Sequence, residues 1–211
     1  MGKELYDNIP SKVGDLLNDV RNGRIGLPDL QRPFVWKDSK VRELLDSMMK
    51  GYPIGYIMLW SSPEDYENTS HIGTNDKIYK RPDDLVIDGQ QRLTALLAAM
   101  YGVSIKDKNY EDRRIHISFN PLTREFAVWT PAYERNPEWV SDISTVFEAD
   151  QEHTISRFRK AFIKTVNEGR EKNNESLLTE DDEDVVETNI NDLLNLKIYS
   201  LPTLKINAKA N

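Results

Sequence analysis

Apolar residues recur three and four positions apart in several stretches of the chain, which is the spacing of one face of an α-helix. Polar residues that can cap a helix precede several of these stretches, and a glycine follows several of them. The pattern predicts helices at residues 13–22, 38–50, 92–101, 139–149, 154–168 and 179–194. The last of these is expected to begin at Thr179 as the N-cap, with acidic residues in its first turn.

Shorter apolar runs alternate with these helices and predict strands. The runs are GYIMLW (55–60), DLVIDG (84–89), a hairpin over 113–130 that turns at NPLT, and KIYSLPTLKI (197–206). The polar segment 61–84 between the first two runs is predicted to be a surface loop. Helix and strand are mixed up to Trp129, and the chain is mostly helical beyond it. We therefore expect a compact α+β domain with a mixed sheet over residues 1–130, followed by a helical extension over 131–211 that ends in a strand.

Composition adds limits to this picture. The chain has 211 residues, a formal net charge of -7 and no cysteine, which removes disulfides and thiolate metal sites. The net negative charge argues against a surface that coats DNA, because such binding depends on Lys and Arg. The longest nearly apolar run, YPIGYIMLW, is too short to span a bilayer. We expect no membrane partner and a cytoplasmic location.

The most informative polar residues are Asp88 to Arg92, which read DGQQR and separate a predicted strand from a predicted helix. A turn of this kind directs backbone N–H groups and the positive end of the helix dipole to one place, where an anion can bind. Gly89 permits close approach, and the Arg92 guanidinium could hold phosphate oxygens. Asp88 either recruits Mg²⁺ or accepts hydrogen bonds from N–H groups of the turn. The alternative for the whole stretch is a capped turn without a ligand.

Three motifs in order carry a resemblance to a known family: QRPFVW (31–36), GYPIG (51–55) and DGQQR (88–92). With them, residues 25–129 resemble the N-terminal domain of the GmrSD type IV restriction enzymes. The resemblance implies a fold similar to ParB and sulfiredoxin, and binding and hydrolysis of a nucleoside triphosphate with Mg²⁺. In that family the nucleotide regulates a nuclease that cuts foreign, often modified, DNA.

The resemblance also implies site residues. The nucleotide-binding set would be Gln31, Arg32, Asp88, Gly89, Gln90, Gln91 and Arg92. From their chemistry we expect Arg32 and Arg92 to contact phosphates and Asp88 to hold Mg²⁺ or the attacking water. Either Gln90 or Gln91 would orient that water, which makes Asp88, Gln90 and Gln91 the expected catalytic residues.

The expected function is therefore a nucleotide-binding regulatory domain, with Mg²⁺-dependent NTP hydrolase activity, of a restriction or phage-defence protein. The alternative is a DNA-recognition module that hydrolyses no nucleotide. The three histidines, His71, His116 and His153, are too far apart in sequence to suggest a nuclease centre. The chain resembles a fragment of a longer protein, so DNA would be reached through the full-length protein or a nuclease partner domain. A homo-oligomer is also expected.

Overall fold

The computed structural model describes residues 5–28, 33–61, 69–70, 77–78 and 82–206. Its helices are α1 (Val13–Arg21), α2 (Asp38–Met49), α3 (Gln90–Tyr101), α4 (Pro131–Arg135), α5 (Ser144–Gln151), α6 (Ile155–Lys172), α7 (Glu180–Asn195) and the 3-10 turn η1 (Leu196–Ile198). Its strands are β1 (Tyr6–Lys12), β2 (Ile25–Pro28), β3 (Ile57–Ser61), β4 (Thr69–Ser70), β5 (Lys77–Ile78), β6 (Asp84–Asp88), β7 (Ile105–Lys106), β8 (Asp112–Arg113), β9 (Ile117–Asn120), β10 (Glu125–Val128) and β11 (Ser200–Ile206).

Seven of these strands form one mixed sheet in the order β1-β11-β3-β6-β2-β4-β5. The pairs β11–β3 and β6–β2 are parallel, and the others are antiparallel. Two separate hairpins, β9–β10 and β7–β8, lie outside this sheet. Helices and strands are thus combined around a mixed sheet, which confirms the predicted α+β class. The likeness to ParB and sulfiredoxin stays a prediction.

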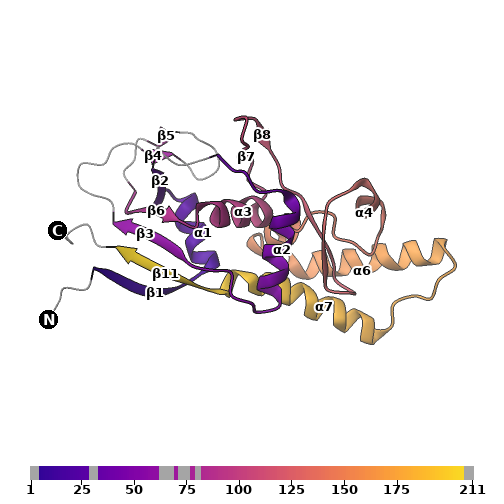
Figure 1. Ribbon diagram of the computed structural model, residues 1–211. Coiled ribbons are helices and arrows are strands. Elements are labelled where there is room, and N and C mark those ends of the chain that lie inside the picture. The colour runs from indigo at the N-terminus through magenta and orange to yellow at the C-terminus, as the bar shows by residue number, and fades with distance from the viewer. Residues whose placement is uncertain (1–4, 29–32, 62–68, 71–76, 79–81, 207–211) are drawn as a thin grey trace.

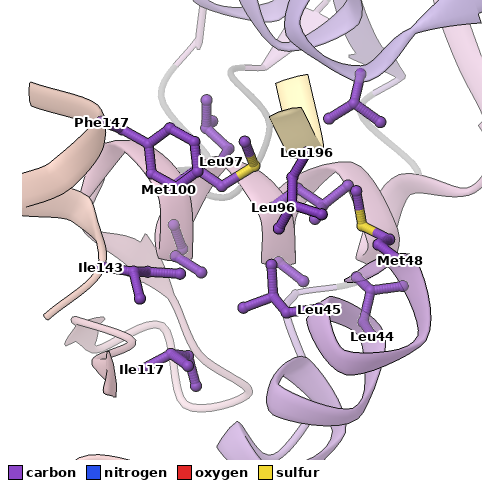
Figure 2. Packing of buried hydrophobic residues seen from close by; sticks show 14 of the residues in the cluster. Leu44, Leu45, Met48, Leu96, Leu97, Met100, Ile117, Ile143, Phe147 and Leu196 are labelled. Carbon is purple, nitrogen blue, oxygen red and sulfur yellow. The ribbon is translucent and has the colours of Figure 1, made fainter. Parts of the chain in front are cut away.

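Helix α3 lies in the middle of the hydrophobic core. Its residues from Leu93 to Met100 are all buried, so it is covered on every side, as expected of an interior helix. Figure 2 shows Leu96, Leu97 and Met100 of α3 among side chains of several other elements. These neighbours come from α2, β9, α5 and η1 and from the residue before α5: Leu44, Leu45, Met48, Ile117, Ile143, Phe147 and Leu196.

The second half of the chain returns to the sheet. Helices α6 and α7 run beside each other (Figure 1), and Arg159 of α6 joins them through Glu187 at 2.7 Å. The chain then passes through η1 into β11, which lies between β1 and β3. Buried residues from both halves belong to one hydrophobic cluster. The division of the chain at residue 130 stays a prediction.

Several sequence predictions match the structure closely. Helices α1, α2 and α7 agree with the predicted stretches to within about two residues, and strands β3, β6, β9, β10 and β11 overlap theirs. Helices α5 and α6 were predicted with other bounds: α5 begins at Ser144 and not at residue 139, because Val140 instead bridges to Phe119 of β9.

Thr179 is the N-cap of α7, and its side chain and that of Asp182 bond reciprocally to each other's main-chain N–H. The Asp182 carboxylate also accepts from the Thr179 hydroxyl at 2.8 Å. The bond from the Thr179 N–H and, after it, the bond from the hydroxyl hold the pKa of the Asp182 carboxyl below its ordinary value.

Other elements differ from the prediction. Strand β1, helix α4 and the β7–β8 hairpin were missed, and α6 continues to Lys172, into the predicted linker. The segment 61–84, predicted as a loop, contains the short strands β4 and β5, and much of the rest lies outside the described residues. None of the helices that the structure describes is long and apolar enough to cross a membrane.

Candidate functional site

The DGQQR residues lie where β6 ends and α3 begins. Asp88 is the last residue of β6, Gly89 is the N-cap, and Gln90, Gln91 and Arg92 form the first turn of α3. The prediction that the helix begins at Arg92 was therefore wrong by two residues. Glutamine and arginine are good helix formers, so the first turn extends back to the glycine. Because the N-cap is a glycine, the N-cap residue makes no side-chain hydrogen bond to the first turn of the helix.

Gly89 has no room for a side chain. Its φ is +90°, a left-handed conformation that residues with a Cβ rarely adopt. A Cβ at this position would lie 2.4 Å from Cδ1 of Ile57 and 3.2 Å from the Tyr56 carbonyl oxygen. The glycine thus permits β6 to turn into α3 directly against the start of β3.

Arg92 holds the segment that precedes β3. Its Nη1 donates a hydrogen bond to the carbonyl oxygen of Tyr56 at 2.5 Å. Its Nη2 lies 2.9 Å from where a Cβ of Gly55 would be, and Gly55 has a φ of +96°. The GYPIG motif is therefore placed against the DGQQR turn by this guanidinium. Arginine has five N–H donors, so one bond to Tyr56 leaves others available for a ligand.

Gln91 is bonded to the main chain of the QRPFVW motif. Its Oε1 accepts a hydrogen bond from the Val35 N–H at 2.9 Å, and its Nε2 donates one to the Pro33 carbonyl at 3.0 Å. The two main-chain partners fix which end of the amide is oxygen. Gln31 and Arg32, the other predicted binding residues, lie outside the described residues, directly before Pro33. The structure thus brings the described part of QRPFVW to DGQQR and gives Gln91 a positioning function.

Gln91→Glu is expected to destabilise the protein by about 1–2 kcal/mol. A carboxylate can still accept from Val35, but it would face the Pro33 carbonyl without a proton to donate, a loss of about 1–3 kcal/mol. The dipole of α3 would offset roughly 0.3–1 kcal/mol of that, because the new charge lies in the first helical turn. Urea unfolding measures the difference, with exposed Gln151→Glu as the control for added charge. Gln151 ends α5, so the helix dipole costs this control about 0.3–1 kcal/mol, which is allowed for in the comparison. Equal stability of Gln91→Glu and the wild type would contradict the positioning function.

Asp88 and Gln90 complete the motif. Asp88 is exposed, and its main chain pairs with Met58 of β3. Gln90 is half-buried. The described residues contain no group of three or more His, Asp or Glu side chains placed to hold a metal ion. Mg²⁺ commonly binds through one or two carboxylates together with phosphates of a substrate, and a single exposed carboxylate such as Asp88 is compatible with that mode of binding.

The contacts around Arg92 and Gln91 involve residues for which the sequence predicted no function. Gly55, Tyr56 and the main chain of Pro33 and Val35 all adjoin the motif. The only sequence signal was that Gly55, Pro33 and Val35 lie inside GYPIG and QRPFVW, and that Tyr56 directly follows GYPIG. The contacts themselves are between residues 36 to 58 positions apart, and no spacing rule predicts them.

Other polar residues have structural partners elsewhere. Arg113 bonds to the Trp36 carbonyl and pairs with Asp38 at the start of α2. Arg114 and His116 both contact the Asp142 carboxylate, at 3.2 and 3.1 Å. A cavity of about 570 Å³ lies between α2, β10 and the Tyr133–Trp139 ring pair, away from Asp88.

Comparison with known proteins shows which sequences this chain is similar to. An uncharacterized protein of Methanocaldococcus jannaschii, MJ0686, is 34% identical over 102 residues, which are 45% of this chain and 18% of that protein. The chain thus spans less than a fifth of the length of this relative. The family described as GmrSD restriction endonuclease, N-terminal domain, matches residues 13–209, nearly the whole chain. The chain therefore belongs to the family of GmrSD restriction endonuclease N-terminal domains.

Proposed function

We propose that this chain is a nucleotide-binding domain that hydrolyses a nucleoside triphosphate and thereby regulates a restriction protein. The observation that carries the proposal is the start of α3, where DGQQR meets two other motifs. The N-cap is a glycine, so the N-cap residue itself has no side chain to cap the helix. Main-chain N–H groups at such a start, with the positive end of the helix dipole, bind phosphate.

Electrostatics near the helix start support a phosphate together with a cation. Arg92 is half-buried in the first turn and has donors beyond its bond to Tyr56. Asp88 would repel a bare phosphate at the same place, so its charge requires a counter-ion there. Mg²⁺ held between Asp88 and the phosphates would remove that repulsion. The metal would also polarise the phosphoryl group that is transferred.

In this proposal each residue has one function. The N–H groups at the start of α3 and the remaining Arg92 donors hold the phosphates, and Asp88 holds the metal. Gln90 orients the water that attacks the terminal phosphorus, which releases a nucleoside diphosphate and phosphate. Gln91 keeps Pro33 and Val35 in place, since both ends of its amide are already bonded to main chain. Gln31 and Arg32 are proposed as further phosphate contacts.

The first test is a calorimetric titration with each ribonucleoside triphosphate, with and without Mg²⁺, on the wild type and on Asp88→Asn. We expect Mg²⁺-dependent binding that Asp88→Asn weakens at least about tenfold, since a contact to a charged group is worth about 1.5–3 kcal/mol. Without Mg²⁺, Asp88→Asn should bind as well as the wild type or better, because a repulsive charge has gone.

Asp83→Asn is the matched control, because Asp83 is also an exposed aspartate and lies just before β6. It should leave both titrations unchanged. If the wild type binds no nucleotide in Mg²⁺, the proposal fails. If Asp88→Asn strengthens binding in Mg²⁺, Asp88 is not the metal ligand.

DNA recognition is the second candidate function. The observation that favours it is on α6, where Arg157, Lys160 and Lys164 are exposed and recur at helical spacing. Lys164 is already 3.7 Å from Glu168, which weakens its attraction for phosphate. DNA binding that falls steeply with salt, is lost in Lys160→Ala and does not depend on nucleotide would favour this function over the first.

A further inference from the structure

We propose that Tyr56 is the residue on which the base of the bound nucleotide stacks. The inference rests on the proposed function, because it places the base next to phosphates held at the start of α3. It assigns a ligand contact to the GYPIG–β3 segment. Tyr56 is 42% exposed, although its carbonyl oxygen is bonded to Arg92.

The register of the sheet places the Tyr56 ring and the Asp88 carboxylate on the same face. Met58 pairs with Asp88 directly beside a register shift of the β3–β6 ladder, and paired residues of adjacent strands project to one side. Side chains alternate along an extended chain, so Tyr56, two residues before Met58, projects to that side as well. Ile57 and Leu59, between and beyond them, are buried on the opposite side. The ring therefore projects from the same side of the sheet as the carboxylate proposed to hold Mg²⁺.

The main chain that carries this ring is held at both ends. The hydroxyl of Tyr199 donates a hydrogen bond to the Tyr52 carbonyl at 2.7 Å, and Arg92 donates to the Tyr56 carbonyl at 2.5 Å. Between them, Gly55 adopts a φ of +96° with the Arg92 guanidinium against it. A ring on a fixed backbone loses little conformational freedom when a base covers it, so more of the stacking energy contributes to affinity.

An aromatic ring beside a phosphate site fits a nucleotide better than it fits free phosphate. Bases stack on tyrosine with little dependence on sequence, because every base has a π-face. The ring would therefore strengthen binding of all four nucleoside triphosphates. It would add nothing to the binding of inorganic tripolyphosphate, which has no base.

The test compares nucleoside triphosphates with inorganic tripolyphosphate, both in Mg²⁺, by calorimetry on the wild type, Tyr56→Ala and Tyr56→Phe. We expect Tyr56→Ala to weaken nucleotide binding by roughly 5- to 150-fold and to leave tripolyphosphate binding unchanged. Tyr56→Phe keeps the ring and should bind both like the wild type. Tyr6→Ala is the matched control, since Tyr6 is 56% exposed on β1, which β11 separates from β3.

Three results would overturn the inference. The first is unchanged nucleotide binding in Tyr56→Ala, and the second is an equal loss for both ligands. The third needs no variant: a wild-type protein that binds nucleotide no more tightly than tripolyphosphate has no stacked base. Each of these three results would leave the proposed phosphate site at the start of α3 unaffected. If the wild type binds neither ligand, the proposed function and this inference both fail.

Discussion

A chain shortened to residues 1–130 is expected not to fold. The shortened chain would lose β11, which lies between β1 and β3 and pairs with both. Strand β1 would then have no partner, and the β3 edge would be open. The fragment would also lose α5 and α7, which pack in the core with α3.

The size of this effect follows from the side chains that residues 131–211 bury. They are Val140, Ile143, Val146, Phe147, Ala149, Phe162, Val166, Leu178, Val186, Ile190, Leu193, Leu194, Leu196 and Leu201. A fully buried side chain of this size contributes about 1.5–3 kcal/mol, whereas whole domains are stable by only about 5–15 kcal/mol. The removed residues take their own ordering entropy with them. The loss to the fragment is therefore the burial of its own side chains against them, and exposing a few such side chains is enough to offset the stability of a domain.

Circular dichroism and urea unfolding of the 1–130 chain measure the outcome. We expect no cooperative unfolding transition in this fragment. A chain that ends at Ile206 is the control, because it keeps β11 and should unfold like the full chain. A cooperative transition in the 1–130 fragment would establish that the first part folds alone, as a separate domain.

Gly89→Ala is expected to lower the free energy of unfolding by about 2–5 kcal/mol. A left-handed backbone costs a residue with a Cβ about 1–2 kcal/mol, and overpacking adds about 1–3 kcal/mol. The overpacking comes from Ile57, whose Cδ1 would lie 2.4 Å from the new methyl group. For a chain of this length the change corresponds to a fall in Tm of roughly 5–15 °C.

Gly51→Ala separates the two costs. Gly51 has a φ of +73°, but no atom lies within 4 Å of a Cβ built there. It should therefore lose only about 1–2 kcal/mol, the backbone part of the effect. Differential scanning calorimetry of both variants gives the comparison. If the two variants are equally stable, Ile57 moves aside and the close approach at Gly89 has no energetic importance.

The positions of the three motifs explain why they occur together in the sequence. Gln91 bonds to the main chain of Pro33 and Val35, and Arg92 bonds to the main chain of Tyr56. Both contacts are to backbone, so they depend on the path of the partner segment more than on its side chains. DGQQR therefore organises two neighbouring segments in addition to forming the start of α3.

The sequence by itself determined the local elements. Periodicity located α2, α6, α7 and the β9–β10 hairpin, because the alternation of buried and exposed positions is a property of each segment alone. The Thr179 cap was predictable for the same reason, since its partner Asp182 is three residues away. The chemical character of Asp88, Gly89 and Arg92 was equally visible, because a glycine-containing turn between a strand and a helix is a local pattern.

The tertiary structure decided how these elements are connected. Strand β1 was missed because its residues are mostly exposed, so it has no apolar alternation, and its partner β11 is nearly 200 positions away. The position of β11 between β1 and β3 also depends on contacts between distant residues, as do the bonds from Gln91 and Arg92 to main chain. Such contacts are selected by packing of the whole chain, and no single segment contains the information that specifies them.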